Sequence, residues 1–152
     1  MEYTFFFGSI IAIVILFFIS IKIKRLTLSC IIIGISTIGF SLVVDILFGD
    51  YFKLYYYLSP KELPLYAILS AIFIYPLLNI IYILFLPKRT MKVLIYTLFW
   101  IIFLLIFEYC TLQTKTIVFT GWKPYPWSVV LYIVAYSWIY SFYRYLSRKI
   151  DR

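Results

Sequence analysis

Long apolar runs alternate with short polar segments along almost the whole chain. Each run is close to the length of about 20 residues that an α-helix needs to cross the hydrocarbon of a bilayer. The five runs cover residues 3–21, 26–48, 65–86, 93–112 and 128–146. The polar backbone of a membrane span must be bonded internally, and no alternating pattern indicates a barrel. The sequence therefore predicts an all-α integral membrane bundle of five transmembrane helices in a single domain, residues 1–152.

The composition agrees with this pattern. Of 152 residues, 65% are hydrophobic and 13% are charged, which is too apolar for a soluble domain of this size. The first run follows Glu2 instead of basic residues, and Lys22 and Lys24 stand where a small-residue cleavage site would be expected. We therefore interpret this run as a retained span and not as a cleaved signal peptide.

The net charge of +8 is distributed by position. Ten basic residues fall on one predicted side and four on the other, which places the N-terminus outside and the C-terminus in the cytoplasm. The ten are Lys22, Lys24, Arg25, Lys88, Arg89, Lys92, Arg144, Arg148, Lys149 and Arg152; the four are Lys53, Lys61, Lys115 and Lys123. Topology and contact with anionic lipid explain the basic clusters without a nucleic-acid partner.

Sequence motifs for catalysis, cofactor binding or metal binding are missing. The chain contains no His, and its two cysteines, Cys30 and Cys110, fall in predicted opposite leaflets, beyond the reach of a disulfide. Both are interpreted as small apolar packing residues. The sequence predicts no metal site, no cofactor and no enzyme activity.

Two aromatic loops are predicted on the outer side, at residues 49–61 and 113–127. Ser59, Pro60 and Glu62 have the pattern of a helix start. In the second loop one Gly and two prolines argue against a helix, while the β-branched stretch 116–120 favours a short extended piece. The aromatic residues of both loops, with Tyr55, Tyr56 and Tyr57 of the first among them, are interpreted as a belt at the lipid headgroups in preference to a ligand cage. The most prominent are Trp122, Tyr125 and Trp127.

Asp45 ends a stripe of small residues in the second run. The members of the stripe fall within roughly 80° of arc on one helix face, so this face should pack against another helix. They are Cys30, Gly34, Thr37, Ser41 and Asp45. Asp45 is therefore expected to point into the bundle.

Glu108 has the same character in the fourth run. It shares one face with Thr97, Trp100 and Thr111, and it lies, like Asp45, roughly 6 Å of helix from the predicted outer end of its span. Both acids would then sit near helix C-termini, where the macrodipole disfavours negative charge unless a cation compensates. Lys53, Lys115 and Lys123 are the nearest candidate cations by loop position.

A stripe of hydroxyls occupies one face of the fifth run. It consists of Ser128, Tyr132, Tyr136, Tyr140 and Tyr143. Tyr132 falls at the depth of the two acids, so a hydrogen bond from Tyr132 to a carboxylate is one expectation, and a stack of core aromatics is the other. Ser128 and Tyr132 complete the candidate polar site with Asp45 and Glu108.

A second polar layer is expected deeper in the bundle. Tyr75, Asn79 and Tyr82 share one face of the third run, and Asn79 lies about 20 Å of helix from the outer end, away from the acids. Pro76 removes a backbone hydrogen bond and frees the carbonyl of Ile72, which Asn79 or a neighbouring helix could satisfy.

These positions carry a family resemblance. Asp45, Tyr75-Pro76, Glu108-Tyr109, Gly121-Trp122 and Ser128 together resemble a family of uncharacterised small multi-pass membrane proteins of spore-forming Gram-positive bacteria. The likeness runs from about Ser41 to Arg144, and its most specific part is the Trp-rich stretch before the last run. The resemblance implies a bacterial plasma membrane and a sporulation or envelope context, but no known activity.

Two functional hypotheses follow. The first is a non-enzymatic small subunit or scaffold, in which the acids fasten helices together and the outer face engages a membrane-protein partner or further copies of the chain. The second is a minimal proton- or cation-coupled transporter or channel-like oligomer that uses an outer-leaflet pair formed by Asp45 and Glu108. The structural interpretation of the acids is slightly preferred because their shallow depth lowers the cost of ionisation.

Overall fold

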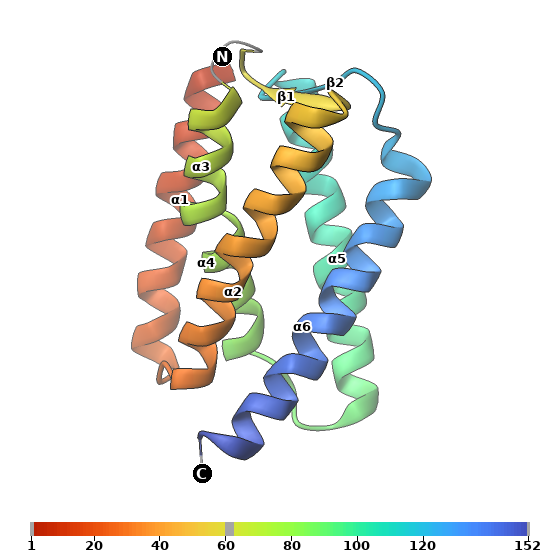
Figure 1. Cartoon of the computed structure of the whole chain (residues 1–152). Coiled ribbons are helices and arrows are strands. Elements are labelled where there is room, and N and C mark those ends of the chain that lie inside the picture. The colour runs from red at the N-terminus through yellow and green to blue at the C-terminus, as the bar shows by residue number, and fades with distance from the viewer. Residues whose placement is uncertain (1, 60–62, 152) are drawn as a thin grey trace.

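The computed structural model describes residues 2–59 and 63–151 and is a mostly helical bundle (Figure 1). The helices and strands follow one another as α1 (Glu2–Ile23), α2 (Leu28–Val44), the π-helical segment η1 (Asp45–Tyr51), β1 (Tyr55–Tyr57), α3 (Leu63–Phe73), α4 (Tyr75–Leu84), α5 (Thr90–Gln113), β2 (Ile117–Phe119), the π-type turn η2 (Pro124–Ser128) and α6 (Val129–Lys149). The predicted all-α class is confirmed, with one small sheet added. Each of the five apolar runs lies largely in helix.

The helix limits differ from the predicted runs at several points. The second helix continues past residue 48, because η1 extends α2 to Tyr51 without a break. The third run is divided into α3 and α4 at Ile74, two residues before Pro76, whose ring cannot donate a backbone hydrogen bond. The side chain of Asn79, in the first turns of α4, bonds to side chains of α2 and α6. The predicted helix start at residues 59–62 falls largely on residues 60–62, outside the described part of the chain.

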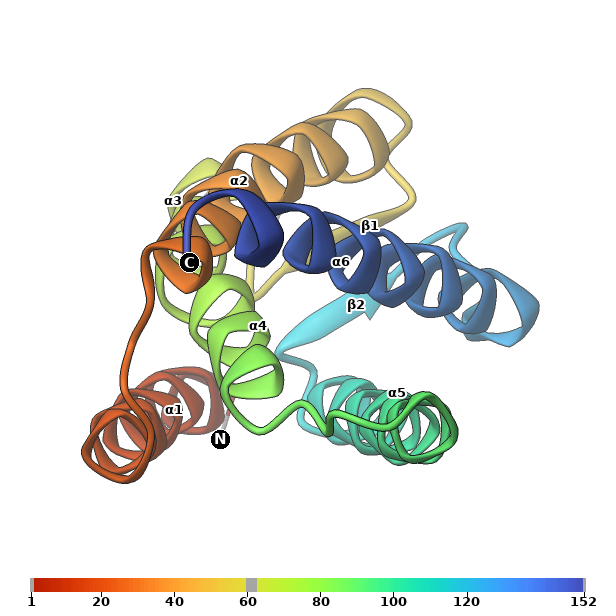
Figure 2. The same cartoon turned by 90° about the horizontal axis from the view of Figure 1, so that it is seen from below.

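Helix α4 occupies the centre of the bundle. Seen along the bundle in Figure 2, α1, α2, α5 and α6 surround it. The buried side chains of α4 follow one another almost without interruption, as expected for a helix that is covered on all sides. They are Pro76, Leu78, Asn79, Ile80, Ile81, Tyr82 and Ile83. The outward faces of α1 and α5 are, by contrast, largely exposed and apolar.

The small-residue face of α2 packs on α4, as predicted. A Cβ added at Gly34 would lie 2.8 Å from Cδ1 of Ile80, so that side chain would have to shift to make room for a larger residue. Cys30, Thr37 and Asp45 on the same face are buried. A matched glycine on α2, Gly39, has open space around its missing Cβ. The stripe of small residues therefore sets the distance between α2 and α4.

A two-stranded antiparallel sheet covers one end of the bundle (Figure 1). It joins the two predicted aromatic loops, with Tyr55 opposite Phe119 and Tyr57 opposite Ile117. Beyond the strands, the carbonyl of Leu54 accepts the backbone N–H groups of three consecutive residues, 120–122, at 2.9–3.1 Å. The predicted extended piece is confirmed in β2. The argument against helix in the second loop was incomplete, since Pro124–Ser128 makes one wide turn that leads directly into α6.

The two ends of the bundle differ in charge. Figure 1 places the α1–α2 and α4–α5 connections and the C-terminal end of α6 away from the sheet, and these segments carry nine described basic residues. Lys53, Lys115 and Lys123 lie in the segments at the sheet end. Four helical stretches are long and apolar enough to cross a membrane: Glu2–Ile23, Leu28–Tyr51, Leu65–Leu84 and Thr90–Gln113. Helix α6 contains tyrosines, serines, two arginines and a lysine that lower its hydropathy, and it is not among these four.

Candidate functional site

Asp45 lies at the junction of α2 and η1, beneath the sheet, and is only 4% exposed. Its Oδ1 accepts two phenol hydrogen bonds, from Tyr55 at 2.6 Å and from Tyr57 at 3.0 Å. The Tyr57 hydroxyl also lies 2.7 Å from that of Tyr75 on α4. Burial, and after it the nearby Asp45 carboxyl group, raises the pKa of Tyr55 and Tyr57 above the ordinary tyrosine value, so both remain protonated donors.

The second oxygen of this carboxyl group is different. Asp45 Oδ2 is buried and has no hydrogen-bond partner among the residues that the structure describes. A carboxylate oxygen can accept more than one hydrogen bond, and leaving it without a donor away from water is unfavourable. Asp45 therefore keeps one free acceptor inside the bundle.

Glu108 is held from the opposite side, by α6. Ser128 Oγ donates to Glu108 Oε1 and Tyr132 Oη donates to Oε2, both at 2.6 Å. Ser128 in turn accepts a hydrogen bond from the indole N–H of Trp122 at 2.9 Å. The predicted hydrogen bond between Tyr132 and a carboxylate is confirmed. Each oxygen of Glu108 thus has its own hydroxyl donor.

Hydroxyl groups, and not the lysines considered from the sequence, hold both acids. The donors to the two carboxylates are Tyr55, Tyr57, Ser128 and Tyr132. The predicted unfavourable helix end is also wrong for Asp45, because η1 continues the helix for six further residues. The negative end of the helix dipole therefore lies beyond Asp45.

Asp45 and Glu108 line one cavity of about 200 Å³. Residues of all six α-helices line its wall, and the sheet covers it at one end. The lining is mostly apolar and aromatic, and its polar members are the two acids, Asn79 and several serine, threonine and tyrosine hydroxyl groups. Its phenylalanines are Phe5, Phe6, Phe40, Phe107 and Phe119. Such a surface, apolar with a few convergent polar groups, is typical of small-molecule sites.

We use the name acid layer for the set Asp45, Tyr55, Tyr57, Tyr75, Glu108, Ser128 and Tyr132. Tyr75 belongs to this layer through its contact with Tyr57, although the sequence analysis assigned it to the deeper polar layer. The reason for this error is that β1 folds back over the bundle and brings Tyr57 down to Tyr75. A strand that pairs with a distant segment is not visible in helical periodicity.

Asn79 forms the floor of the cavity, apart from the acids, as expected. Its amide donates to Thr37 Oγ1 at 3.2 Å and its carbonyl accepts from Tyr136 Oη at 2.7 Å. Trp100 Nε1 donates to the same Tyr136 hydroxyl at 2.8 Å. A series of side-chain hydrogen bonds therefore joins α2, α4, α6 and α5. The side chain of Asn79 takes part in this series instead of bonding to the carbonyl of Ile72.

Below Asn79 lies an aromatic layer, which we define as Tyr82, Tyr96, Thr97, Trp100 and Tyr136. Tyr82 is fully buried, and its ring is within 4.8–5.7 Å of the rings of Tyr96, Trp100 and Tyr136. Its hydroxyl lies 2.7 Å from Thr97 Oγ1 on α5. The aromatic layer is tightly packed, and its polar atoms bond to one another.

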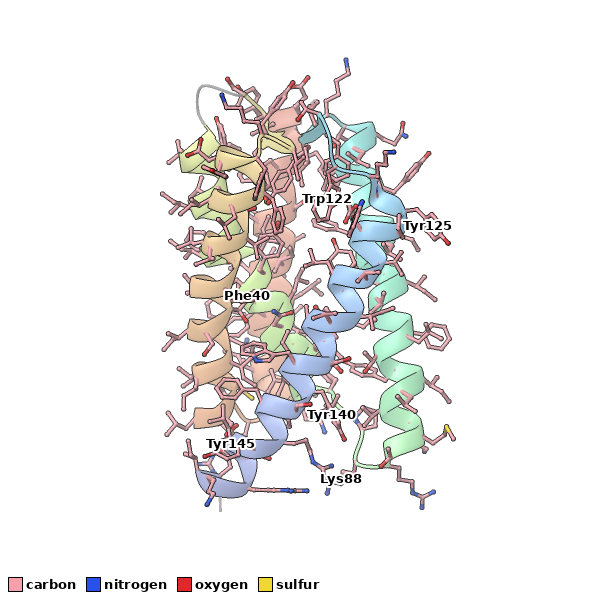
Figure 3. The ribbon with its side chains drawn as sticks, turned by 45° about the vertical axis from the view of Figure 1, so that its right-hand side comes forward. Phe40, Lys88, Trp122, Tyr125, Tyr140 and Tyr145 are labelled. Carbon is pink, nitrogen blue, oxygen red and sulfur yellow. The ribbon has the colours of Figure 1, made fainter. Side chains whose placement is uncertain are left out.

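The outer aromatic loop separates into two parts. Trp122 points inward, with its ring against Phe48 and Tyr55, while Tyr125 points away from the bundle (Figure 3). Tyr125 and Trp127 are 82% and 57% exposed. The favoured interpretation of the loop as a headgroup belt thus suits Tyr125 and Trp127, whereas Trp122 supports the acid layer through Ser128.

Two positions in the acid layer escaped sequence reasoning, namely Tyr55 and Tyr57. They were grouped with a headgroup belt because the run Tyr55-Tyr56-Tyr57 stands in a loop. Their alternation was the available signal, since residues 55 and 57 of a strand point to one face and residue 56 to the other.

Comparison with known proteins assigns no role to this cavity. Comparison with protein-family models, with curated proteins and with solved structures gave no match in any of the three. Among the described residues, moreover, no three His, Cys, Asp or Glu side chains come together in a group that could hold a metal ion. The chemistry of the cavity therefore has to be argued from its own side chains.

Proposed function

We propose that the chain is a non-enzymatic, five-span protein of the bacterial plasma membrane that binds a proton or a monovalent cation in the cavity between Asp45 and Glu108, as a minimal cation-coupled transporter. One observation carries the proposal: two acids from different helices line the same cavity, and one of their four oxygens has no donor among the described residues. A purely structural anchor needs neither a shared cavity nor a free acceptor.

The proposed topology has the N-terminus and the sheet outside and the C-terminus in the cytoplasm. The concentration of basic residues at the end away from the sheet supports this orientation. Helix α6 is the fifth proposed span. Its 21 residues correspond to roughly 32 Å of helix, and its tyrosines at 132 and 136 turn toward the bundle, where their hydroxyls are bonded.

Flux measurements test the transport function. The protein in proteoliposomes should show proton or monovalent-cation flux, and Asp45→Asn and Glu108→Gln should each lower it at least tenfold. Asp50→Asn is the matched control, because Asp50 lies in the same π-helical segment but is exposed. If Asp45→Asn and Glu108→Gln, like the control, keep flux at the wild-type level, this function is ruled out.

A second candidate is the small subunit or scaffold, which could act with a membrane-protein partner or as a homo-oligomer. The observation that favours it is that each of the other three carboxylate oxygens accepts a hydrogen bond from at least one hydroxyl group, as in a structural anchor. In that case Asp45→Asn and Glu108→Gln should accumulate poorly, and the wild-type protein should co-purify with a stable partner. A lone monomer in mild detergent would contradict this candidate.

A further inference from the structure

The cavity is larger than a bare ion requires. Its volume is about 200 Å³, whereas a cavity of about 150 Å³ lined by apolar side chains accommodates benzene. Aromatic and aliphatic residues make up most of the wall, including Phe6, Phe40 and Leu104. An inorganic cation would leave this apolar surface unfilled. A ligand that fills the cavity therefore needs an apolar body about the size of one ring.

The polar part of the wall requires a hydrogen-bond donor with positive charge. Asp45 Oδ1 already accepts two phenol hydrogen bonds, and each oxygen of Glu108 already accepts one hydroxyl hydrogen bond. Asp45 Oδ2 is the remaining carboxylate oxygen, buried and without a partner among the described side chains. An ionised carboxylate only accepts hydrogen bonds, so its partner must carry N–H or O–H.

Charge selects between these donors. Two acids share one mostly apolar cavity, and the groups that bond to them are neutral hydroxyls. A cation between them gains Coulomb energy that a neutral alcohol does not, because the effective dielectric is low there. The tyrosine rings of the lining, among them Tyr55 and Tyr57, add favourable cation–π surfaces.

We propose that the cavity binds a small organic ammonium ion, in which a protonated amine donates to Asp45 Oδ2 and a ring-sized apolar group fills the space between α2, α4, α5 and α6. Glu108 contributes its charge from the far wall, and Ser128 and Tyr132 fix its orientation. This inference rests on the proposed cation-binding function and names the chemical class of the cation. The ammonium group belongs to a soluble amine or to the head of an amine-bearing lipid.

Binding of phenethylammonium tests the inference. The full chain is placed in nanodiscs of phosphatidylglycerol, which carries no amine, and the ligand is titrated by calorimetry. Saturable binding is expected, at least tenfold tighter than that of 2-phenylethanol, which has a similar shape and no charge. Methylammonium, which lacks the apolar body, should also bind at least tenfold more weakly. Equal affinities for all three compounds would overturn the proposal.

Variants locate the binding. Asp45→Asn should weaken phenethylammonium binding at least tenfold, while the exposed Asp50→Asn should leave it unchanged. Should Asp45→Asn fail to accumulate, Ala135→Leu gives an independent answer, because it keeps both acids and adds volume to the cavity wall. It too should lower the affinity at least tenfold. Wild-type affinity in Asp45→Asn, or in Ala135→Leu when only that variant folds, would exclude the cavity as the site.

Two comparisons separate the remaining outcomes. Inhibition of phenethylammonium binding by added phosphatidylethanolamine would assign the site to a lipid headgroup, and unchanged binding would assign it to a soluble amine. Cation flux that depends on Asp45 without any amine binding would overturn this inference and leave the proposed function standing. Amine binding without flux would uphold the inference and reject transport.

Discussion

The acid layer and the aromatic layer lie one above the other in the same bundle, and both contain hydrogen-bonded hydroxyl side chains. In the aromatic layer the hydroxyls of Tyr82 and Tyr136 bond to neutral groups, and the rings around them fill the space. In the acid layer the hydroxyls bond to carboxylates that face a cavity. The aromatic layer is therefore filled by packed rings, whereas the acid layer borders the cavity in which we propose that a ligand binds.

The stability of the two layers should therefore respond differently to mutation. A group that fills space loses packing when it is shortened, while a group that faces a cavity loses mainly its hydrogen bonds. Substitutions of Tyr82, Asp45 and Ser128 examine this contrast, and Gly34→Ala examines the contact between α2 and α4. Each is measured as the free energy of unfolding in detergent micelles, with helicity as the signal.

Tyr82→Ala should have the largest effect, a loss of about 3 kcal/mol, because it removes a fully buried ring that three other aromatic rings surround. Tyr82→Phe is the control. It keeps the ring and loses only the hydrogen bond to Thr97, at about 0.6 kcal/mol. Equal losses in the two variants would show that the layer is held by polar bonds and not by packing.

Asp45→Leu should destabilise the bundle by about 2 kcal/mol, since it leaves the partly buried hydroxyl of Tyr55 without its acceptor. Adding Tyr55→Phe should restore part of this loss, because removing both partners is less unfavourable than removing one. The measurement is a double-mutant cycle on Asp45 and Tyr55. Simple additivity of the two changes would mean that the bond does not couple them.

Gly34→Ala should lower stability by about 1.5 kcal/mol, since the new Cβ would lie 2.8 Å from Cδ1 of Ile80 and force that side chain to shift in the packed contact between α2 and α4. Gly39→Ala, on the same helix with open space around it, should be neutral or stabilising. Chemical denaturation of the two variants side by side checks this. A reversed order would contradict the assignment of Gly34 as the point of closest approach.

Ser128→Ala should have the smallest effect, about 1 kcal/mol, because Glu108 keeps Tyr132 and loses only one of its two donors. Trp122 also loses its acceptor, so its fluorescence should shift as the indole N–H becomes unpaired. Ser141→Ala, at an exposed hydroxyl on the same helix, serves as the reference. An unchanged Trp122 signal would argue against the link from the loop to Glu108.

Much of the architecture was predictable from the sequence, because helical periodicity is local. The apolar runs predicted the helices, and the stripe on α2 predicted the face that packs on α4, with Thr37 and Asp45 turned inward. The same periodicity in the last run placed Tyr132 at the level of Glu108. In each case the inference needed only residues that are close in the chain.

The rest depended on long-range contacts. The pairing of β1 with β2 joins segments about sixty residues apart and brings Tyr55 and Tyr57 over Asp45, which no local pattern indicates. The same pairing brings Tyr57 into contact with Tyr75, which therefore belongs to the acid layer. It also supplies tyrosine hydroxyls as the donors to Asp45, where lysines were expected. The sequence by itself determined the helices and their inward faces. Only the tertiary structure decided which donors hold the two acids and that both acids line one cavity, because these properties arise where distant segments meet.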